Sequence, residues 1–137
     1  MARAETSGAT LPDDILRGLS TDARVLDCGG GVVAGRSAFE GTWVVGHPVD
    51  LDADGRDDWL VEGRHRCLTG TDGADWWVYS GDTGSARLVA AAGRAQAVEM
   101  LPERHGGFRD LQLQAKQGDL TLRYAAGAYT SVDPAAD

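Results

Sequence analysis

Residues 42–61, TWVVGHPVDLDADGRDDWLV, place an acidic loop between two segments that have the composition of β-strands. Aromatic and β-branched residues fill the flanks at residues 42–45 and 59–61, as is typical of strands. The loop, residues 50–58, carries five carboxylates in nine residues, and these would repel one another without a counter-ion. We therefore predict a strand–loop–strand hairpin whose loop is neutralised by a cation.

The loop reads D-x-D-x-D-G-x-x-D, a spacing that suits calcium, which takes about six to eight oxygen ligands. Alternate aspartates can turn inward, and the glycine at the sixth position permits a sharp turn because glycine tolerates positive φ. The predicted ligands are Asp50, Asp52, Asp54, the backbone carbonyl of Arg56, and Asp58 directly or through a water. The alternative is an acidic turn that stays solvated and holds no ion.

The twelfth position of the loop is Val61, where an EF-hand has a bidentate glutamate. With strands on both sides, residues 49–61 resemble the calcium loops of FG-GAP and VCBS repeats, found in integrin-type propellers and many secreted bacterial proteins. The resemblance implies that the five residues named above hold Ca²⁺ and that Asp57 points away. Because the ion would neutralise a turn between two strands, we expect it to be structural rather than catalytic.

Strand patterns recur through the chain and predict a mainly β fold, an antiparallel meander or sandwich-like single domain with a short N-terminal helix. Residues 10–20 have an apolar face and an acidic first turn, which predicts the helix. In residues 76–79, WWVY, Trp76 and Val78 should face one side and Trp77 and Tyr79 the other. The predicted strands are residues 24–28, 41–48, 58–62 with a continuation at 64–68, 76–79, 85–91, 95–101 ended by Pro102, 111–116, 120–124 and 128–132.

Alternation is clearest near the C-terminus. There Leu111, Leu113, Leu120, Leu122 and Tyr124 should form the dry face of a hairpin. We predict a single domain over residues 11–133, preceded by a flexible tail at residues 1–10.

Residues 25–31, VLDCGGG, resemble the first motif of S-adenosylmethionine-dependent methyltransferases, which implies a strand followed by a cofactor-binding loop. Asp50 would then be the acidic residue at the end of a second strand. However, Val33 replaces the third glycine, and residues 32–41 are short and poorly periodic for the helix that should follow. A glycine-rich turn is therefore the favoured interpretation, with the methyltransferase kept as an alternative.

The net charge of -8 and the isoelectric point near 4.7 argue against binding of nucleic acid or of an anionic membrane surface. No apolar run in the 137 residues is long enough to span a membrane. We therefore expect no nucleic-acid partner and no membrane insertion, and we expect another protein as the partner.

Cys28 and Cys67 are far apart in sequence and form no zinc signature with the scattered histidines. They are either two free thiols or a disulfide, whose loop would stabilise the fold by roughly 4 kcal/mol. Residues 1–8 lack the apolar core of a signal peptide. This leaves either a cytoplasmic protein or one whose signal peptide has been removed. We expect the second, with a periplasmic or secreted location, because the resemblance to calcium-loop repeats implies one.

The leading functional hypothesis is a non-enzymatic extracytoplasmic binding domain with a structural calcium ion, for which an inhibitor or immunity-type role would suit a small acidic domain. No nucleophile elbow and no H-E-x-x-H motif is present. The enzymatic alternatives are the methyltransferase and a metal-assisted hydrolase in which His47 or His65 is the base beside the acidic loop. A structural module of a cell-surface protein is the third alternative.

Overall fold

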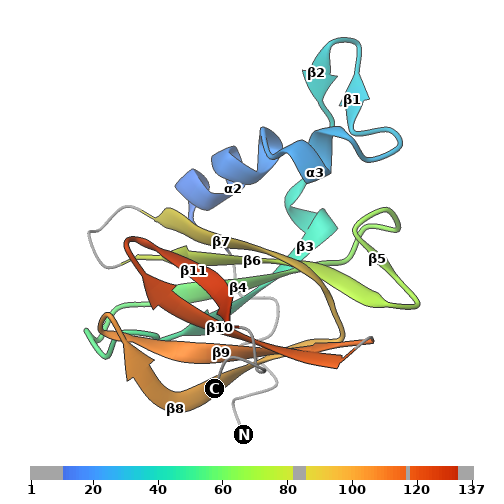
Figure 1. The fold of residues 1–137 in the computed structure, drawn as a ribbon. Coiled ribbons are helices and arrows are strands. Elements are labelled where there is room, and N and C mark those ends of the chain that lie inside the picture. The colour runs from blue at the N-terminus through green and yellow to red at the C-terminus, as the bar shows by residue number, and fades with distance from the viewer. Residues whose placement is uncertain (1–10, 82–85, 117, 133–137) are drawn as a thin grey trace, which may run out of the picture.

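The computed structural model describes residues 11–81, 86–116 and 118–132, which form a mainly β fold in which every strand pairing is antiparallel (Figure 1). The predicted fold class is thus confirmed, whereas the predicted tail at residues 1–10 lies outside the described residues. The helical elements are α2 (Asp13–Ser20), α3 (Ala23–Leu26) and the 3-10 turn η1 (Gly41–Trp43). The strands are β1 (Val32–Val33), β2 (Arg36–Ser37), β3 (Val44–Val49), β4 (Asp58–Gly63), β5 (Thr69–Gly70), β6 (Gly73–Ser80), β7 (Arg87–Ala95), β8 (Ala97–His105), β9 (Phe108–Ala115), β10 (Gly118–Ala125) and β11 (Ala128–Val132).

Two sheets make up the body of the molecule. The five-stranded sheet runs β3-β4-β6, and both β7 and the short β5 pair with β6. The four-stranded sheet runs β8-β9-β10-β11. Only Gln96 separates β7 from β8, and its N–H donates to the carbonyl of Gln114 at 2.8 Å. The chain therefore crosses from one sheet to the other in a nearly continuous extended segment.

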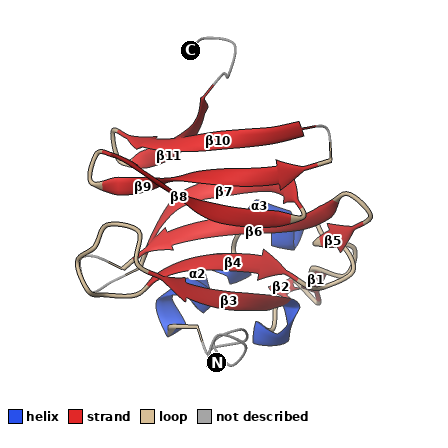
Figure 2. Cartoon of the chain, turned by 90° about the horizontal axis from the view of Figure 1, so that it is seen from below, coloured by secondary structure: helices blue, strands red, loops and turns tan. Residues whose placement is uncertain are grey.

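The five-stranded sheet is buried on both faces. Trp76 and Val78 of β6 belong to the core against the four-stranded sheet, whereas Trp77 and Tyr79 belong to the core under the helices. The alternation predicted for these four residues is confirmed. The result is a three-layer molecule, with the helices over one face of the sheet and the second sheet over the other (Figures 1 and 2).

Helix α2 lies where the sequence predicted a helix. Pro12 precedes it in extended conformation, and two aspartates occupy its first turn, where they favour the positive end of the helix dipole. Ile15 and Leu19 are fully buried against the sheet. Burial of two such side chains contributes about 3–6 kcal/mol, which exceeds what an isolated eight-residue helix could supply for itself.

The strand predicted at residues 24–28 is wrong, because this segment forms the short helix α3. The carboxylate of Asp22 caps the helix by accepting from the N–H of Arg24 at 2.9 Å. Arg24 also reaches across to the sheet, donating to the carbonyl of Trp76 at 2.9 Å. The glycine-rich run at residues 29–31 therefore follows a helix rather than the strand that the methyltransferase motif requires.

Three smaller predictions also need correction. Residues 64–68 form a turn rather than a continuation of β4, because the N–H of Leu68 bonds back to the carbonyl of His65 at 2.7 Å. Leu120 is 41% exposed, so the dry face of the C-terminal hairpin is incomplete. β8 passes Pro102 and continues to residue 105, with its register against β9 interrupted between residues 100 and 104. Proline fits there because β8 is an edge strand, where a missing N–H leaves no partner unpaired.

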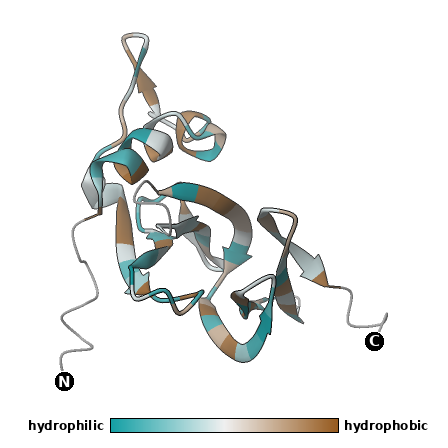
Figure 3. Ribbon diagram, turned by 90° about the vertical axis from the view of Figure 1, so that its left-hand side faces the viewer, coloured by the Kyte–Doolittle hydropathy of each residue, from teal (hydrophilic) through white to brown (hydrophobic). Residues whose placement is uncertain are grey.

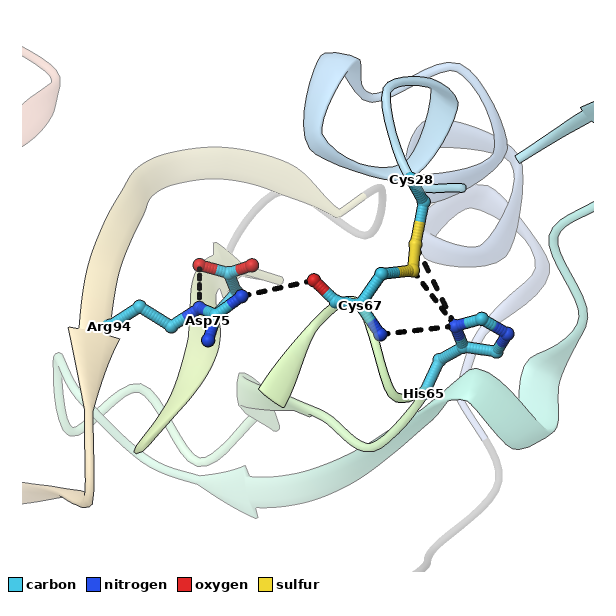
Figure 4. The surroundings of a disulfide bond; sticks show 5 residues. All are labelled: Cys28, His65, Cys67, Asp75 and Arg94. Atoms are coloured by element: carbon cyan, nitrogen blue, oxygen red, sulfur yellow. Dashed lines mark hydrogen bonds and ion pairs between the residues drawn. A yellow bond between two sulfur atoms is a disulfide. The ribbon is translucent and has the colours of Figure 1, made fainter. Parts of the chain in front are cut away.

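Cys28 and Cys67 form a disulfide, which settles the alternative between a bridge and free thiols (Figure 4). It joins the residues after α3 to the turn before β5, and the two cysteines are 39 positions apart in sequence. The helical layer is thus tied covalently to the sheet that it covers.

We predict that the double substitution Cys28→Ser and Cys67→Ser lowers the free energy of unfolding by roughly 2–4 kcal/mol, because the unfolded chain regains the entropy of a long loop. Urea denaturation followed by tryptophan fluorescence measures the change. A reducing agent should destabilise the wild type to the same extent and leave the double variant unchanged. An unaltered denaturation midpoint in the variant would contradict a stabilising bridge.

Candidate metal centre

The acidic loop joins β3 to β4, as the sequence predicted. Asp50 follows the last residue of β3, and Asp58 is the first residue of β4. Carboxylate oxygens of Asp50, Asp52, Asp54 and Asp58, one from each residue, all lie within 4.8 Å of one another. The structure therefore brings the four predicted carboxylates together.

The loop turns sharply enough to converge because its backbone enters the left-handed region twice. Ala53 has a φ of 61° and Gly55 a φ of 82°. Only the second position carries the glycine that this conformation favours. Two hydrogen bonds from backbone N–H groups to side-chain carboxylates fix the turn. The N–H of Gly55 donates to Oδ2 of Asp50 at 3.1 Å, and the N–H of Arg56 donates to Oδ1 of Asp54 at 2.8 Å.

Asp58 is fully buried and holds the loop to the sheet. Its Oδ2 accepts from the N–H of Leu51 at 2.8 Å, and its Oδ1 accepts from the N–H of Gly81 at 2.9 Å. Gly81 must be a glycine for this approach, since a Cβ there would lie 2.5 Å from the carbonyl oxygen of Asp57. One carboxylate thus joins the acidic loop, the start of β4 and the end of β6.

The loop is also anchored to the second sheet. Leu51 is fully buried in the core between the two sheets. Its carbonyl accepts from the N–H of Arg109 in β9 at 2.9 Å. The hydroxyl of Tyr129 in β11 donates to the carbonyl of Arg109 at 2.7 Å. Residues on three strands from both sheets therefore support one acidic turn.

The cluster is electrostatically unfavourable by itself. Burial, together with the nearby carboxylates of Asp58 and Asp54, raises the pKa of Asp52 to about 6. Burial also raises the pKa of Asp58, although the backbone N–H groups of Gly81 and Leu51 oppose the change. Oδ1 of Asp52 is buried and has no hydrogen-bond partner among the described residues. A bound cation would offset both the repulsion and the unmet hydrogen-bonding capacity.

The donor set consists of carboxylate oxygens, which suit a hard divalent cation such as Ca²⁺ better than a soft metal. Arg56, whose carbonyl is the fifth predicted ligand, lies in the exposed part of the loop. Asp57 is exposed and is not a member of the cluster, in line with its predicted outward orientation. The ligand assignment and the identity of the ion remain predictions that rest on this geometry.

The two histidines considered as bases for a hydrolase have other contacts. His47 lies 3.0 Å from Glu62 through Nε2, and Nδ1 of His65 lies 2.9 Å from Sγ of Cys67 (Figure 4). Neither histidine belongs to the carboxylate cluster. The closeness of His65 to the disulfide was missed by the sequence reasoning, although the H-x-C spacing of residues 65 and 67 was the signal that could have suggested it.

Comparison of the chain with known protein families, with curated proteins and with solved structures found no match. Among the described residues, no helix has the length and apolar character needed to cross a membrane. Any functional assignment therefore depends on the residues and contacts described above.

The raised pKa of Asp52 gives the ion-free protein a distinct pH dependence. A carboxyl whose pKa rises on folding from about 3.8 to about 6 binds its proton more tightly in the folded state. This contribution to stability is complete below the unfolded pKa and is lost as the pH rises through about 6. With chelator present, Asp52→Asn should therefore melt higher than the wild type at about pH 7, and the difference should shrink toward about pH 5.

Scanning calorimetry of both proteins in chelator measures this difference. Asp57→Asn, on the same loop but outside the cluster, is the matched control and should show no such trend. A variant Asp52→Asn that melts below the wild type at every pH in chelator would contradict the electrostatic description of the loop.

Proposed function

We propose that this chain is an extracytoplasmic β domain that is stabilised by one calcium ion and acts by binding another protein. The observation that carries the proposal is the convergence of four carboxylates on a loop anchored to both sheets. An ion bound there would fix the β3–β4 turn and its contacts with β6 and β9. Its role is structural, because it would hold these elements together.

The disulfide supports a location outside the cytoplasm. Bridges such as Cys28–Cys67 form and persist in oxidising compartments and are rare in the cytosol of most organisms. Calcium sites of extracellular modules are commonly weak, because the ion is abundant there. A loop without the bidentate glutamate of an EF-hand suits such conditions.

The binding role is supported by the hairpin of β1 and β2. Among the described strands, β1 and β2 pair with each other and with no other strand, and the hairpin stands clear of the body of the molecule (Figures 1 and 3). Val32 and Val33 are 50% and 60% exposed, and the next four residues are also exposed. Val32 and Val33 are consecutive strand residues and point to opposite faces of the hairpin, so a partner that encloses the projection on both faces would bury both side chains.

Rigidity at the base of this hairpin favours recognition. Cys28 lies three residues before Gly31, whose carbonyl accepts from the N–H of Ala38 at 2.8 Å. The two ends of the hairpin are thus joined to each other, and the disulfide lies next to them. Such a preformed element loses little conformational entropy on binding, which suits the inhibitor or immunity-type role.

The enzymatic alternatives have less support from the geometry. The methyltransferase motif requires a strand where α3 lies, and the two histidines proposed as hydrolase bases contact Glu62 and Cys67 instead. The alternative of a module within a cell-surface protein is compatible with the same fold and the same ion.

We predict that the wild-type protein melts at a higher temperature in calcium than in chelator. Magnesium at the same concentration should raise the melting temperature far less. Calcium at about 100-fold over its dissociation constant should add roughly 2.7 kcal/mol to the free energy of unfolding. Magnesium should act weakly because it is smaller and needs near-octahedral geometry with several retained waters.

Asp52→Ala should abolish the calcium effect, whereas Asp57→Ala on the same loop should retain it. Isothermal titration calorimetry with calcium gives the affinity of each variant directly. If wild-type melting is the same in calcium, magnesium and chelator, the loop is an ordinary acidic turn and the calcium part of the proposal is wrong.

We also predict that Val32→Asp and Val33→Asp together weaken the complex with the protein partner at least about tenfold, because two apolar contacts are lost. The partner is first identified with a photo-crosslinking residue at position 33, and the affinity is then measured with purified proteins. Leu120→Asp, an exposed leucine on the body, is the matched control and should change the affinity less than about twofold. Equal losses for both variants would contradict recognition through the hairpin.

A further inference from the structure

A pocket of about 380 Å³ opens between the two sheets, outside the acidic loop. This volume lies within the usual range for sites that bind small molecules. One wall comes from the five-stranded sheet and the other from the chain that crosses into β8. The lining residues are His47, Val49, Leu60, Glu62, Trp76, Gln96, Ala97 and Val98.

The pairing of strands explains why these side chains share one face. Residues that pair directly across antiparallel strands point to the same side of the sheet. His47 pairs with Leu60, and Glu62 pairs with Trp76. Because Leu60 and Trp76 both belong to the core between the sheets, all four side chains point toward the second sheet. β3 and β8 are the edge strands of their sheets, so the space between them opens to the side of the sandwich.

The side chains of His47 and Glu62 contact each other and form the polar end of the pocket. Nε2 of His47 lies 3.0 Å from Oε1 of Glu62. The imidazole stacks with the indole of Trp76 at a centroid distance of 5.9 Å. The indole is itself fixed, because its N–H donates to the carbonyl of Ala95 at 3.0 Å. The carboxylate of Glu62 is thus held at the end of a pocket whose other walls are mainly apolar.

We propose that this pocket binds a small organic cation, a primary ammonium group on an apolar stem, with Glu62 as its counter-charge. Glu62 is the one acidic residue among the eight that line the pocket. Val49, Leu60 and Val98 provide apolar contacts for the stem, and the carboxylate accepts hydrogen bonds from the ammonium group. The net charge of -8 favours the approach of cations over that of anions.

Arg64 gives the proposal a second, independent consequence. Its Nη2 lies 3.7 Å from Oε1 of Glu62, and its side chain is 54% exposed. An exposed guanidinium so close to this carboxylate competes with an incoming ammonium ion. Removal of the arginine side chain should therefore strengthen binding, whereas removal of the carboxylate should abolish it.

The inference goes beyond the proposed function, because none of the pocket residues belongs to the carboxylate cluster or to the β1–β2 hairpin. Failure of the calcium proposal would leave it untouched. To test the ammonium pocket separately from the calcium site, ligand binding is measured once in chelator and once in calcium. The affinity for the ligand should be the same in the two buffers.

The test is a titration with n-pentylammonium chloride followed by ¹H–¹⁵N NMR of the full chain. The indole N–H of Trp76 and the backbone of residues 47, 62 and 96–98 should shift together with one dissociation constant. The neutral analogue 1-pentanol and the anion pentanoate have stems of the same length. Both should bind at least about tenfold more weakly, and this comparison needs no variant.

Glu62→Gln should weaken n-pentylammonium binding at least about tenfold, and Arg64→Gln should strengthen it about two- to threefold. Shifts spread over the surface without saturation, equal affinity for 1-pentanol, or unchanged affinity in a folded Glu62→Gln variant would each overturn the proposal. In a parallel titration, Nα-acetyl-lysine methylamide tests a lysine side chain as the source of the ammonium group. If this lysine derivative binds as tightly as n-pentylammonium, the natural ligand is the lysine side chain of a peptide. If it binds more weakly, the natural ligand is a free amine.

Discussion

The fold depends on one buried carboxylate, that of Asp58. It lies at the start of β4 and accepts the backbone N–H groups of Leu51 and Gly81. Without this carboxylate, both N–H groups would lose a charged hydrogen-bond acceptor. Each N–H group left buried and unpaired would lower the stability by about 1–3 kcal/mol. Because one of these bonds fixes the acidic loop and the other fixes the end of β6, this single side chain sets how three segments of the five-stranded sheet meet.

The same carboxylate creates the electrostatic problem that makes the loop a candidate metal centre. Burial raises its pKa, and its charge contributes to the raised pKa of Asp52. The loop cannot relax away from it, because Leu51 is buried in the core and bonded to β9. For the proposed calcium ion, a cluster held in this way would lower the cost of binding, since most of the ordering has been completed during folding.

Burial of the central sheet on both faces explains where interaction surfaces remain. The helices cover one face and the second sheet covers the other (Figure 1), so access is left at the edges and at projections. The β1–β2 hairpin extends from the helical layer, where the disulfide lies close to its base. The pocket of Glu62 opens between the two sheets, on the side where β3 and β8 are the edge strands.

The sequence by itself determined the strand periodicity, the helix α2 and the spacing of the acidic loop, because these depend on residues that are neighbours along the chain. Alternation in residues 76–79 was enough to assign each aromatic side chain to a face of the sheet. A short apolar run suits either a strand or a helix, and two contacts favour the helix at residues 23–26. The cap from Asp22 is local and was overlooked in the strand prediction, whereas the hydrogen bond from Arg24 to the carbonyl of Trp76 was decided only by the tertiary structure. The disulfide, the anchoring of Asp58 by Gly81 and the pairing of His47 with Glu62 were likewise decided only by the fold, because each joins residues whose proximity no local pattern encodes.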